Sequence, residues 1–415
     1  MNGLPTNGPE SSPDDLPLAG VRVLDLSRVF AGPLCGMVLS DFGAEVVKVE
    51  HPGRGDDTRD FGIRIGQTET TYFNSMNRNK RSVTIDLQKP EGRRLVHALL
   101  PQFDVVIHNF KAGGAEKLGL GYEELSAIKP GLVYCVVSGY DSSGPEAARP
   151  GYDLVVQGEA GLMALNGEAG TPPLKFGVAV VDMMTGMYAA QAVLAALVRR
   201  ERTGRGQRVE LALYDCALMV TGYYGLDALA LGRDPERYGN AHPSIVPYGL
   251  YEAADGPLII AVGNNAQFDR FCRHVVDRPD IVDDPNFATN VGRTKNRAWL
   301  RPLLEELIRS FPRDVLLERL QAEGIPCGQV SGLHEALTSE RTRRGALVQD
   351  MPHPVAGTTP VFAPPYRLDG RRPPIRRAPP TLGEGTREVL QRLLQLSEAE
   401  LQALRAQGVL SLPAA

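Results

Sequence analysis

The sequence predicts an α/β protein with a large, open, parallel-sheet domain and a smaller α+β domain. Short strands rich in valine and isoleucine alternate with helical segments between residues 21 and 140, as in the strand–helix–strand units of parallel sheets. The length of 415 residues exceeds what a single core usually holds, so two domains are expected. Ligands of such sheets bind outside the carboxyl ends of the strands. In this sequence those ends carry glycine, asparagine and charged residues.

The first strand–helix–strand unit is expected over residues 21–50, as "VRVLDLS", "AGPLCGMVLSDFG" and "AEVVKVE". The pattern recurs in the strand "SVTIDLQ", the helix "PEGRRLVHALLPQF" and the strand "DVVIHNF", and then in the helix "YEELSAIKP" and the strand "LVYCVVSGY". Later, "KFGVAV" is read as an apolar strand that leads into an apolar helix, and a further strand is expected in "RGQRVELAL". The large domain is therefore expected to be Rossmann-like.

Composition shifts divide the chain into four segments. Residues 1–16 are polar and rich in proline and glycine, which predicts a flexible N-terminal tail. The large domain is expected over 17–220 and the smaller one over 221–326. Residues 327–415 contain strands, proline-rich loops and a terminal helical pair, but too little continuous apolar sequence for a core of their own. We expect this last segment to pack against another domain or subunit.

Charge and cysteine usage exclude several classes of protein. With 45 basic and 49 acidic residues the net charge is −4, which argues against a general binder of nucleic acid or anionic membranes. The five cysteines form no CxxC pair and the seven histidines are scattered, so no metal site is expected. The N-terminus has no apolar signal core, and no stretch reaches about twenty uninterrupted apolar residues. These features predict a reduced, cytoplasmic protein.

Several common nucleotide and hydrolase motifs are absent from the sequence. No GxGxxG follows the first strand, and no GxxxxGK[ST], GxSxG or HExxH is found. Basic residues do occur near the expected strand ends, where they could meet a polyphosphorylated ligand, although each alone is also compatible with a solvated surface charge. They are Arg54, Arg59, Lys80, Arg81, Lys111 and Lys117.

Asp182 is the one acidic residue of the apolar stretch 175–197 and stands at the expected start of a helix. A carboxylate there can cap the helix, because it accepts hydrogen bonds from free backbone N–H groups and favours the positive end of the helix dipole. A carboxylate in apolar surroundings can also attack an activated acyl carbon. The two roles are compatible, and the local sequence leaves both open.

Six segments of the chain together resemble family III CoA transferases (CaiB/BaiF). This is the family of formyl-CoA transferase and carnitine-CoA transferase, with the α-methylacyl-CoA racemases as relatives. The resemblance runs in order from residue 18 to the C-terminus. Its segments are "LAGVRVLDLSRVFAGPLCGMVLSDFGAEVVKVEHPGRGDDTR", "NRNKRSVTIDLQKPEGR", "HNFKAGGAEKLGLGYEEL", "GYDLVVQGEAGLM", "VDMMTGMYAAQAVLAALVRRERTGRGQRVELALYD" and "APPTLGEGTREVL".

The resemblance implies an interlocked homodimer whose subunits each join a large α/β and a small domain, with the C-terminal segment returning to the large domain. It places the family's nucleophilic aspartate on Asp182. That carboxylate would pass through an aspartyl-acyl anhydride and an aspartyl-CoA thioester, with acyl-CoA as a substrate and no tightly bound cofactor.

The resemblance also implies a set of binding residues. Tyr152 and Asp153 correspond to an active-site tyrosine–acid pair that binds substrate. His51 and Lys117 stand where formyl-CoA transferase has arginines. The implied CoA contacts are Val29, Phe30, His51, Ile85, Asp86, Leu87, Gln88, Asn109, Phe110, Lys111 and Lys117.

Two further features of the sequence bear on which substrate is preferred. "NAHPSIVPYGLYEAADGPLIIAVGNNAQF" resembles the succinyl-CoA:dicarboxylate branch, which includes succinate–hydroxymethylglutarate CoA-transferase, and the glycine-rich lid of formyl-CoA transferase is missing. A dicarboxylic acyl-CoA is therefore the expected donor. A racemase is a second possibility, but its "GHD" step reads "GYD" here, and a phenol is a poor base at neutral pH. A non-catalytic acyl-CoA-binding subunit is the third.

Overall fold

The computed structural model describes residues 15–66 and 69–413 and divides into two compact units. The tail expected over 1–16 thus lies outside the described residues except for its last two, of which Leu16 is buried. The first unit comprises Met1–Leu162, Lys175–Leu226 and Glu340–Ala415, and the second Met163–Leu174 and Asp227–Ser339. The domain boundaries inferred from composition, at 220/221 and 326/327, stay predictions.

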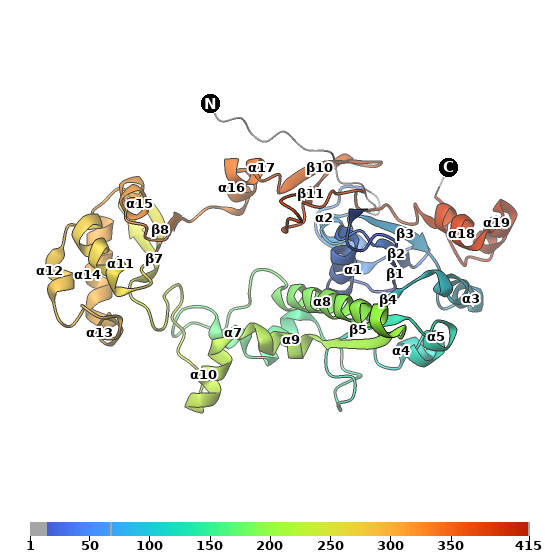
Figure 1. The fold of residues 1–415 in the computed structure, drawn as a ribbon, viewed down its shortest axis with the longest axis horizontal. Coiled ribbons are helices and arrows are strands. Elements are labelled where there is room, and N and C mark those ends of the chain that lie inside the picture. Colours follow the sequence, from blue (N-terminus) through green and yellow to red (C-terminus); the bar gives the residue numbers. More distant parts are fainter. Residues whose placement is uncertain (1–14, 67–68, 414–415) are drawn as a thin grey trace. The chain divides into compact units, whose positions relative to one another are not determined.

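The first unit is built on a six-stranded sheet in which every pair of neighbouring strands is parallel (Figure 1). The strand order is β3-β2-β1-β4-β5-β6, so the direction of winding reverses between β1 and β4. This confirms the predicted α/β class, and such a reversal is where sheets of this kind bind ligands. The strands are β1 Arg22–Asp25, β2 Glu45–Glu50, β3 Lys80–Thr84, β4 Val105–His108, β5 Val133–Ser138 and β6 Gln207–Ala212.

Helices cover both faces of this sheet, because successive strand residues point to opposite sides. Val23 packs with α1 and α8 on one face, whereas Leu24 packs with α3, α5, α18 and α19 on the other. The helices of the first face are α1 Ala31–Asp41, α6 Asp153–Glu159, α8 Val180–Thr203 and α9 Leu213–Val220, and those of the second are α3 Pro90–Leu99, α5 Tyr122–Ile128, α18 Thr386–Leu394 and α19 Glu398–Ala406.

The C-terminal segment returns to this sheet, as Figure 1 shows for α18 and α19. Asp86 N donates to Val409 O over 2.7 Å and Thr84 Oγ1 donates to Ser411 O over 2.9 Å. The remaining elements of the unit are short: α2 Thr71–Asn74, α4 Gly114–Lys117, α17 Glu340–Arg344, the 3-10 turns Asp57–Asp60 and Leu100–Gln102, and the hairpin of β10 Val348–His353 and β11 Gly357–Phe362.

The second unit has an antiparallel sheet in the order β7-β8-β9, packed against helices around its own core of leucine, isoleucine and phenylalanine. Its elements are β7 Tyr248–Ala253, β8 Gly256–Ala261, β9 Cys327–Gln329, α11 Asn265–Arg270, the π-helical turn Phe271–Val275, α12 Pro279–Asp283, α13 Asn290–Lys295, α14 Arg297–Arg309, α15 Arg313–Ala322 and α16 Leu333–Thr338. Two helices, α7 Leu162–Leu165 and α10 Tyr223–Leu231, cross the boundaries between the units.

The prediction of a strand in "KFGVAV" is wrong. Residues 175–179 form no strand in the structure, because Val178 is exposed and no neighbouring strand pairs with this segment. Within the described residues, α8 alone is long and apolar enough to cross a membrane by length and composition. Thr185 and Gly186 of this helix are buried, and Gly186 lies against Leu34 of α1, as expected of a core helix.

Candidate active site

Two adjoining cavities lie at the carboxyl ends of strands β1 to β5. The larger has a volume of about 390 Å³ and the smaller about 200 Å³. They share Arg28, Phe110 and Lys111, which follow β1 and β4. The shared residues lie on either side of the winding reversal, so a single extended ligand can occupy both cavities.

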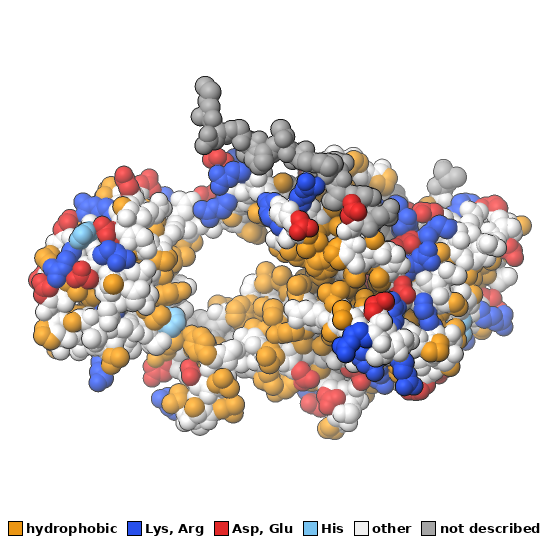
Figure 2. Space-filling model, viewed as in Figure 1, with side chains coloured by type: hydrophobic (Ala, Val, Ile, Leu, Met, Phe, Trp, Pro, Cys, Tyr) orange, Lys and Arg blue, Asp and Glu red, His pale blue; other side chains and the backbone are white. Residues whose placement is uncertain are grey.

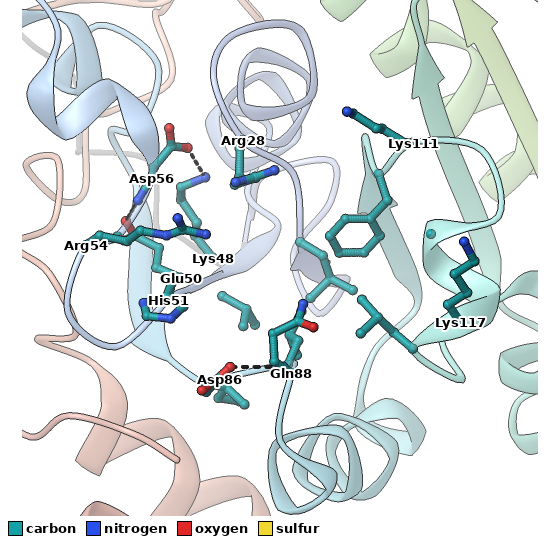
Figure 3. A pocket seen from close by; sticks show the side chains of 18 residues that line it. Arg28, Lys48, Glu50, His51, Arg54, Asp56, Asp86, Gln88, Lys111 and Lys117 are labelled. Atoms are coloured by element: carbon teal, nitrogen blue, oxygen red, sulfur yellow. Dashed lines mark hydrogen bonds and ion pairs between the residues drawn. The ribbon is translucent and has the colours of Figure 1, made fainter. Parts of the chain in front are cut away.

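The larger cavity is lined by loops that follow β1, β2, β3 and β4, and it carries several cations (Figure 3). In Figure 3, His51 and Arg54 lie on one side of the cavity and Lys117 on the other, with Gln88 between them. Within residues 15–66 and 69–413, the side chains of Arg54, Lys111 and Lys117 make no hydrogen bond or ion pair with the protein. Exposed cations without internal partners are suited to a phosphorylated ligand.

Three of the basic residues proposed for this role serve the fold instead. Lys80 is fully buried and donates to Asp25 and to the carbonyl of Pro33. Arg59 is buried against Glu50, with its guanidinium over the ring of Phe73. Arg81, at the start of β3, forms ion pairs with Glu45 and Glu388. Of the two roles left open for these three residues, a ligand contact is not supported, because carboxylates of the protein already pair with them.

The smaller cavity contains Asp182, together with Val29, Phe30, Asn109 and Tyr152. Asp182 is partly buried in the first turn of α8. Tyr152 is 65% exposed and directly precedes α6. The smaller cavity therefore holds a carboxylate, and it shares lining residues with the larger cavity that carries the cations.

The start of α8 is capped by Asp153, not by Asp182. The Asp153 Oδ2 atom accepts hydrogen bonds from Val181 N at 2.8 Å and from Asp182 N at 3.2 Å. Gln157 Nε2 donates to Asp153 Oδ1 over 2.5 Å, and Phe176 N donates to Gln157 Oε1 over 2.9 Å. Because Asp153 satisfies the free N–H groups, the carboxylate of Asp182 is not needed as a cap.

Burial and the neighbouring charge of Asp153 raise the pKa of Asp182 to about 7. Burial also raises the pKa of Tyr72, and the charges of Asp182 and Asp153 raise it further. Tyr72 therefore lies near both carboxylates, and its ring also meets Phe30 edge-on, with centroids 5.9 Å apart. A carboxylate with such a raised pKa is a better nucleophile once ionised than an ordinary surface aspartate.

The structure brings together the residues that the resemblance singled out. His51, Ile85, Asp86, Leu87, Gln88 and Lys117 line the larger cavity, Val29, Phe30, Asn109, Tyr152 and Asp182 line the smaller, Phe110 and Lys111 line both, and Asp153 lies under Asp182. Two residues of the site, Arg28 and Tyr72, were not predicted from the sequence. Arg28 directly follows the first expected strand and could have been found by its position there, whereas nothing in the sequence points to Tyr72.

No metal site accompanies these residues in the described part of the chain, where no group of three or more His, Cys, Asp or Glu side chains could hold a metal ion. All five cysteines are free.

Comparison with known proteins gives a consistent result. The family model of CoA-transferase family III matches residues 18–386. The succinyl-CoA:glutarate CoA-transferase of Mus musculus is 37% identical over 412 residues, or 98% of this chain and 94% of that protein. The succinate–glutarate CoA-transferase of Agrobacterium fabrum is 38% identical over 383 residues, or 91% and 96%.

A solved structure agrees with these sequences. The CAIB/BAIF family protein from Brucella suis is 39% identical and superposes with a TM-score of 0.80 over 91% of this chain and 99% of that chain. The match to the family spans both units of the structure and the return of the C-terminal segment up to α18. The protein described here is therefore a CoA-transferase and belongs to family III.

Proposed function

We propose that this protein moves CoA from succinyl-CoA, or a similar dicarboxylic acyl-CoA, to a second dicarboxylic acid, with Asp182 as the nucleophile. The observation that carries the proposal is the carboxylate of Asp182, which has no capping role and opens into a cavity adjoining one lined by unpaired cations. The names of the relatives, a succinyl-CoA:glutarate and a succinate–glutarate CoA-transferase, support the class of donor and acceptor.

The proposed reaction consists of four acyl exchanges. Asp182 attacks the carbonyl carbon of the donor thioester, forming an anhydride and releasing CoA thiolate. The thiolate then attacks the aspartyl carbonyl, giving an aspartyl-CoA thioester and free succinate. The acceptor carboxylate attacks this thioester and again releases the thiolate, which finally attacks the acceptor carbonyl and regenerates Asp182. Protons balance throughout, because each attacking group and each leaving group is an anion.

The larger cavity is proposed to hold the phosphorylated end of CoA. Arg54, Lys111 and Lys117 supply positive charge there, while Ile85 and Leu87 supply apolar surface. The shared residues Arg28 and Phe110 would then flank the chain that leads to the thioester. Phe30 and Tyr72 would restrict water near Asp182, which matters because water would hydrolyse both the anhydride and the thioester.

The second negative charge of a dicarboxylate needs a cation near Asp182. The smaller cavity offers Arg28, Lys111 and Arg149. Arg149 is already paired with Glu146 and Glu159, and Arg28 has only a long contact of 3.4 Å to Asp57. Lys111 is assigned above to the phosphorylated end of CoA, so Arg28 is the proposed partner of the distal carboxylate.

We also propose that the protein acts as an interlocked homodimer in the cytoplasm, without a tightly bound cofactor. Helix α10 has no buried residue, and its Leu226 and Leu229 are 69% and 81% exposed. Leu218 and Met219 at the end of α9 are exposed as well. Figure 2 shows apolar side chains gathered over these helices. Apolar surface of this kind favours burial by a second subunit, and free cysteines agree with a reducing compartment.

A matrix of donors and acceptors tests the proposed function. Purified protein is mixed with succinyl-CoA, acetyl-CoA or formyl-CoA and with a panel of mono- and dicarboxylic acids, and new thioesters are followed by mass. We expect the fastest transfer from succinyl-CoA to four- to six-carbon diacids. Faster transfer to oxalate or formate would contradict the substrate class, and exchange of deuterium at the α-carbon of a branched acyl-CoA without transfer would favour the racemase.

A further inference from the structure

A buried ion pair forms part of the wall of the larger cavity (Figure 3). Lys48 Nζ is 2.8 Å from Asp56 Oδ2, and both side chains are fully inaccessible to solvent. Lys48 belongs to β2 and Asp56 to the loop that follows this strand. Neither residue was singled out by the sequence, and neither takes part in the acyl exchanges proposed above.

Both members of the pair bind the backbone of the segment that follows β1. Lys48 Nζ donates to Ser27 O over 2.7 Å, and Val29 N donates to the two carboxylate oxygens of Asp56 at 3.2 and 3.3 Å. Asp56 is itself held by Thr58, whose N and Oγ1 donate to it over 3.0 and 2.8 Å. The ion pair thus fixes the backbone on both sides of Arg28.

Asn109 fixes the residue between these two points. Arg28 N donates to Asn109 Oδ1 over 2.9 Å, and Asn109 Nδ2 donates to Arg28 O over 2.7 Å. The backbone groups Ser27 O, Arg28 N, Arg28 O and Val29 N are therefore all bound by side chains from the neighbouring strand ends.

Val29 has a φ of +73°, in the left-handed region. A β-branched residue in this region is a conformational outlier that persists only where the surroundings impose it. The contacts of Lys48, Asp56 and Asn109 impose it here. Relaxation of Val29 to a negative φ would redirect Arg28 and Phe30, which line the cavities.

We propose that Lys48 and Asp56 are positioning residues of the transfer reaction, which hold Val29 in its left-handed conformation so that residues 28–30 line the site of Asp182. The inference rests on the proposed role of Asp182. Neither residue of the pair touches the reacting atoms, and both act through the backbone of Ser27 and Val29.

Lys48 and Asp56 are both expected to be charged in the folded protein, as their contacts with the backbone require. Burial lowers the pKa of Lys48, but Asp56, Asp25 and Glu50 raise it by more, so the ammonium stays charged. Burial raises the pKa of Asp56, but Lys48 and the hydrogen bonds from Thr58 lower it by more, so the carboxylate stays ionised. A well-packed apolar pair of similar volume is often as stable as a buried ion pair, whereas only the charged pair binds both Ser27 O and Val29 N.

Kinetics of Lys48→Met and Asp56→Asn, with the full-length protein and the best donor and acceptor from the matrix above, test the proposal. We expect kcat per folded protein to fall by about 10²-fold for Lys48→Met, since small displacements of a site cost this much. The KM for acyl-CoA should stay within about threefold, because the larger cavity keeps its other lining residues. Asp56→Asn retains an acceptor for Val29 N and should lose less.

A matched control is Arg200→Met, which breaks the partly buried ion pair with Asp104 away from both cavities. It should lower the unfolding midpoint and leave kcat unchanged. Unchanged kcat in folded Lys48→Met, or failure of both Lys48→Met and Asp56→Asn to fold, would mean that the pair is structural and overturn the inference. An inactive wild-type protein would instead contradict the proposed function.

Coupling to Val29 gives a readout that a structural role would not move. Glycine adopts a φ of +73° without strain, so Lys48→Met should cost at least threefold less in kcat in a Val29→Gly background than in the wild type. Equal losses in the two backgrounds would show that Lys48 does not act through Val29.

Discussion

Charged residues are arranged differently at the two ends of the strands in the six-stranded sheet. We call the side where the strands begin the amino edge and the side where they end the carboxyl edge. At the amino edge, Arg22, Arg81 and Arg392 converge on the single carboxylate of Glu45, and together they lower its pKa despite burial. At the carboxyl edge, some cations are buried in ion pairs, as Lys48 is, and others line a cavity without a partner, as Lys117 is. Cations paired within the protein hold side chains and backbone in place, whereas those left unpaired beside a cavity remain available to a ligand.

The strongest test of this contrast is Asp182→Asn at the carboxyl edge. Asparagine keeps the size of the side chain but cannot attack a thioester, so kcat should fall by about 10⁴-fold or more with the fold intact. Activity is measured as new thioester formed per minute. Hydroxylamine added during wild-type turnover should also leave a hydroxamate on the peptide that contains Asp182, detected by mass.

Asp215→Asn is the matched control for that substitution, because Asp215 also lies in the first turn of a helix, α9, but is exposed. It should keep wild-type activity. Near-wild-type turnover in Asp182→Asn, with deamidation excluded by mass, would mean that another group is the nucleophile.

The next largest effect is expected on acyl-CoA binding. Lys111→Ala and Lys117→Ala each remove a cation without an internal partner from the larger cavity, so the KM for acyl-CoA should rise about tenfold for each, since a hydrogen bond to a charged group contributes about 1.5–3 kcal/mol. Initial rates over a range of donor concentrations measure this. Arg81→Ala at the amino edge should leave KM unchanged, and an equal rise there would remove the distinction between the two edges.

A third test at the carboxyl edge concerns the ionisation of Asp182, measured through the pH dependence of kcat. Because Asp182 must be ionised to attack and its pKa is about 7, kcat should rise with pH around neutrality. Asp153→Asn removes the neighbouring negative charge, so the rising limb should move to lower pH. The pH profile of Glu159→Gln, on the same helix α6, should keep its limb near 7, and a limb unmoved by Asp153→Asn would argue that Asp153 does not act on Asp182.

The smallest expected effect is on the free energy of unfolding. Its dependence on pH has the opposite sign to that of an aspartate whose pKa is lowered in the folded state. The folded pKa of Asp182 is raised, so between about pH 4 and 7 the folded state binds more protons than the unfolded state, and stability falls as pH rises through that window. Asp182→Asn should therefore be more stable than wild type at pH 8, by roughly 2 kcal/mol when its partial exposure is taken into account, and similar to wild type at pH 4. Thermal melts at both values measure this, and a lower midpoint for Asp182→Asn at pH 8 would contradict it.

Strand–helix alternation was sufficient to predict the sheet, because residues such as Val23 and Leu24 point to opposite faces and both are buried. The strand expected before Asp182 failed for a related reason: an apolar run predicts a strand only where a partner strand exists, and Val178 has none. The sequence alone could not separate Lys80 from Lys117, since burial beside a carboxylate distant in sequence decides which cation remains for a ligand. The placement of Asp153 under α8 depends on a loop whose path is set by tertiary packing.

The return of residues 386–412 to the sheet has a consequence for how the chain folds. Val389, Leu390 and Val409 fill the core on one face of β1 to β5, and the hydrogen bond between Thr84 and Ser411 joins residues 327 positions apart. Helices α3 and α5 cover part of that face, but during synthesis the part that packs against α18 and α19 stays uncovered while most of the second unit is being made. Contacts so distant in sequence slow folding, so we expect the core on this face to be completed only after α18 and α19 have been made.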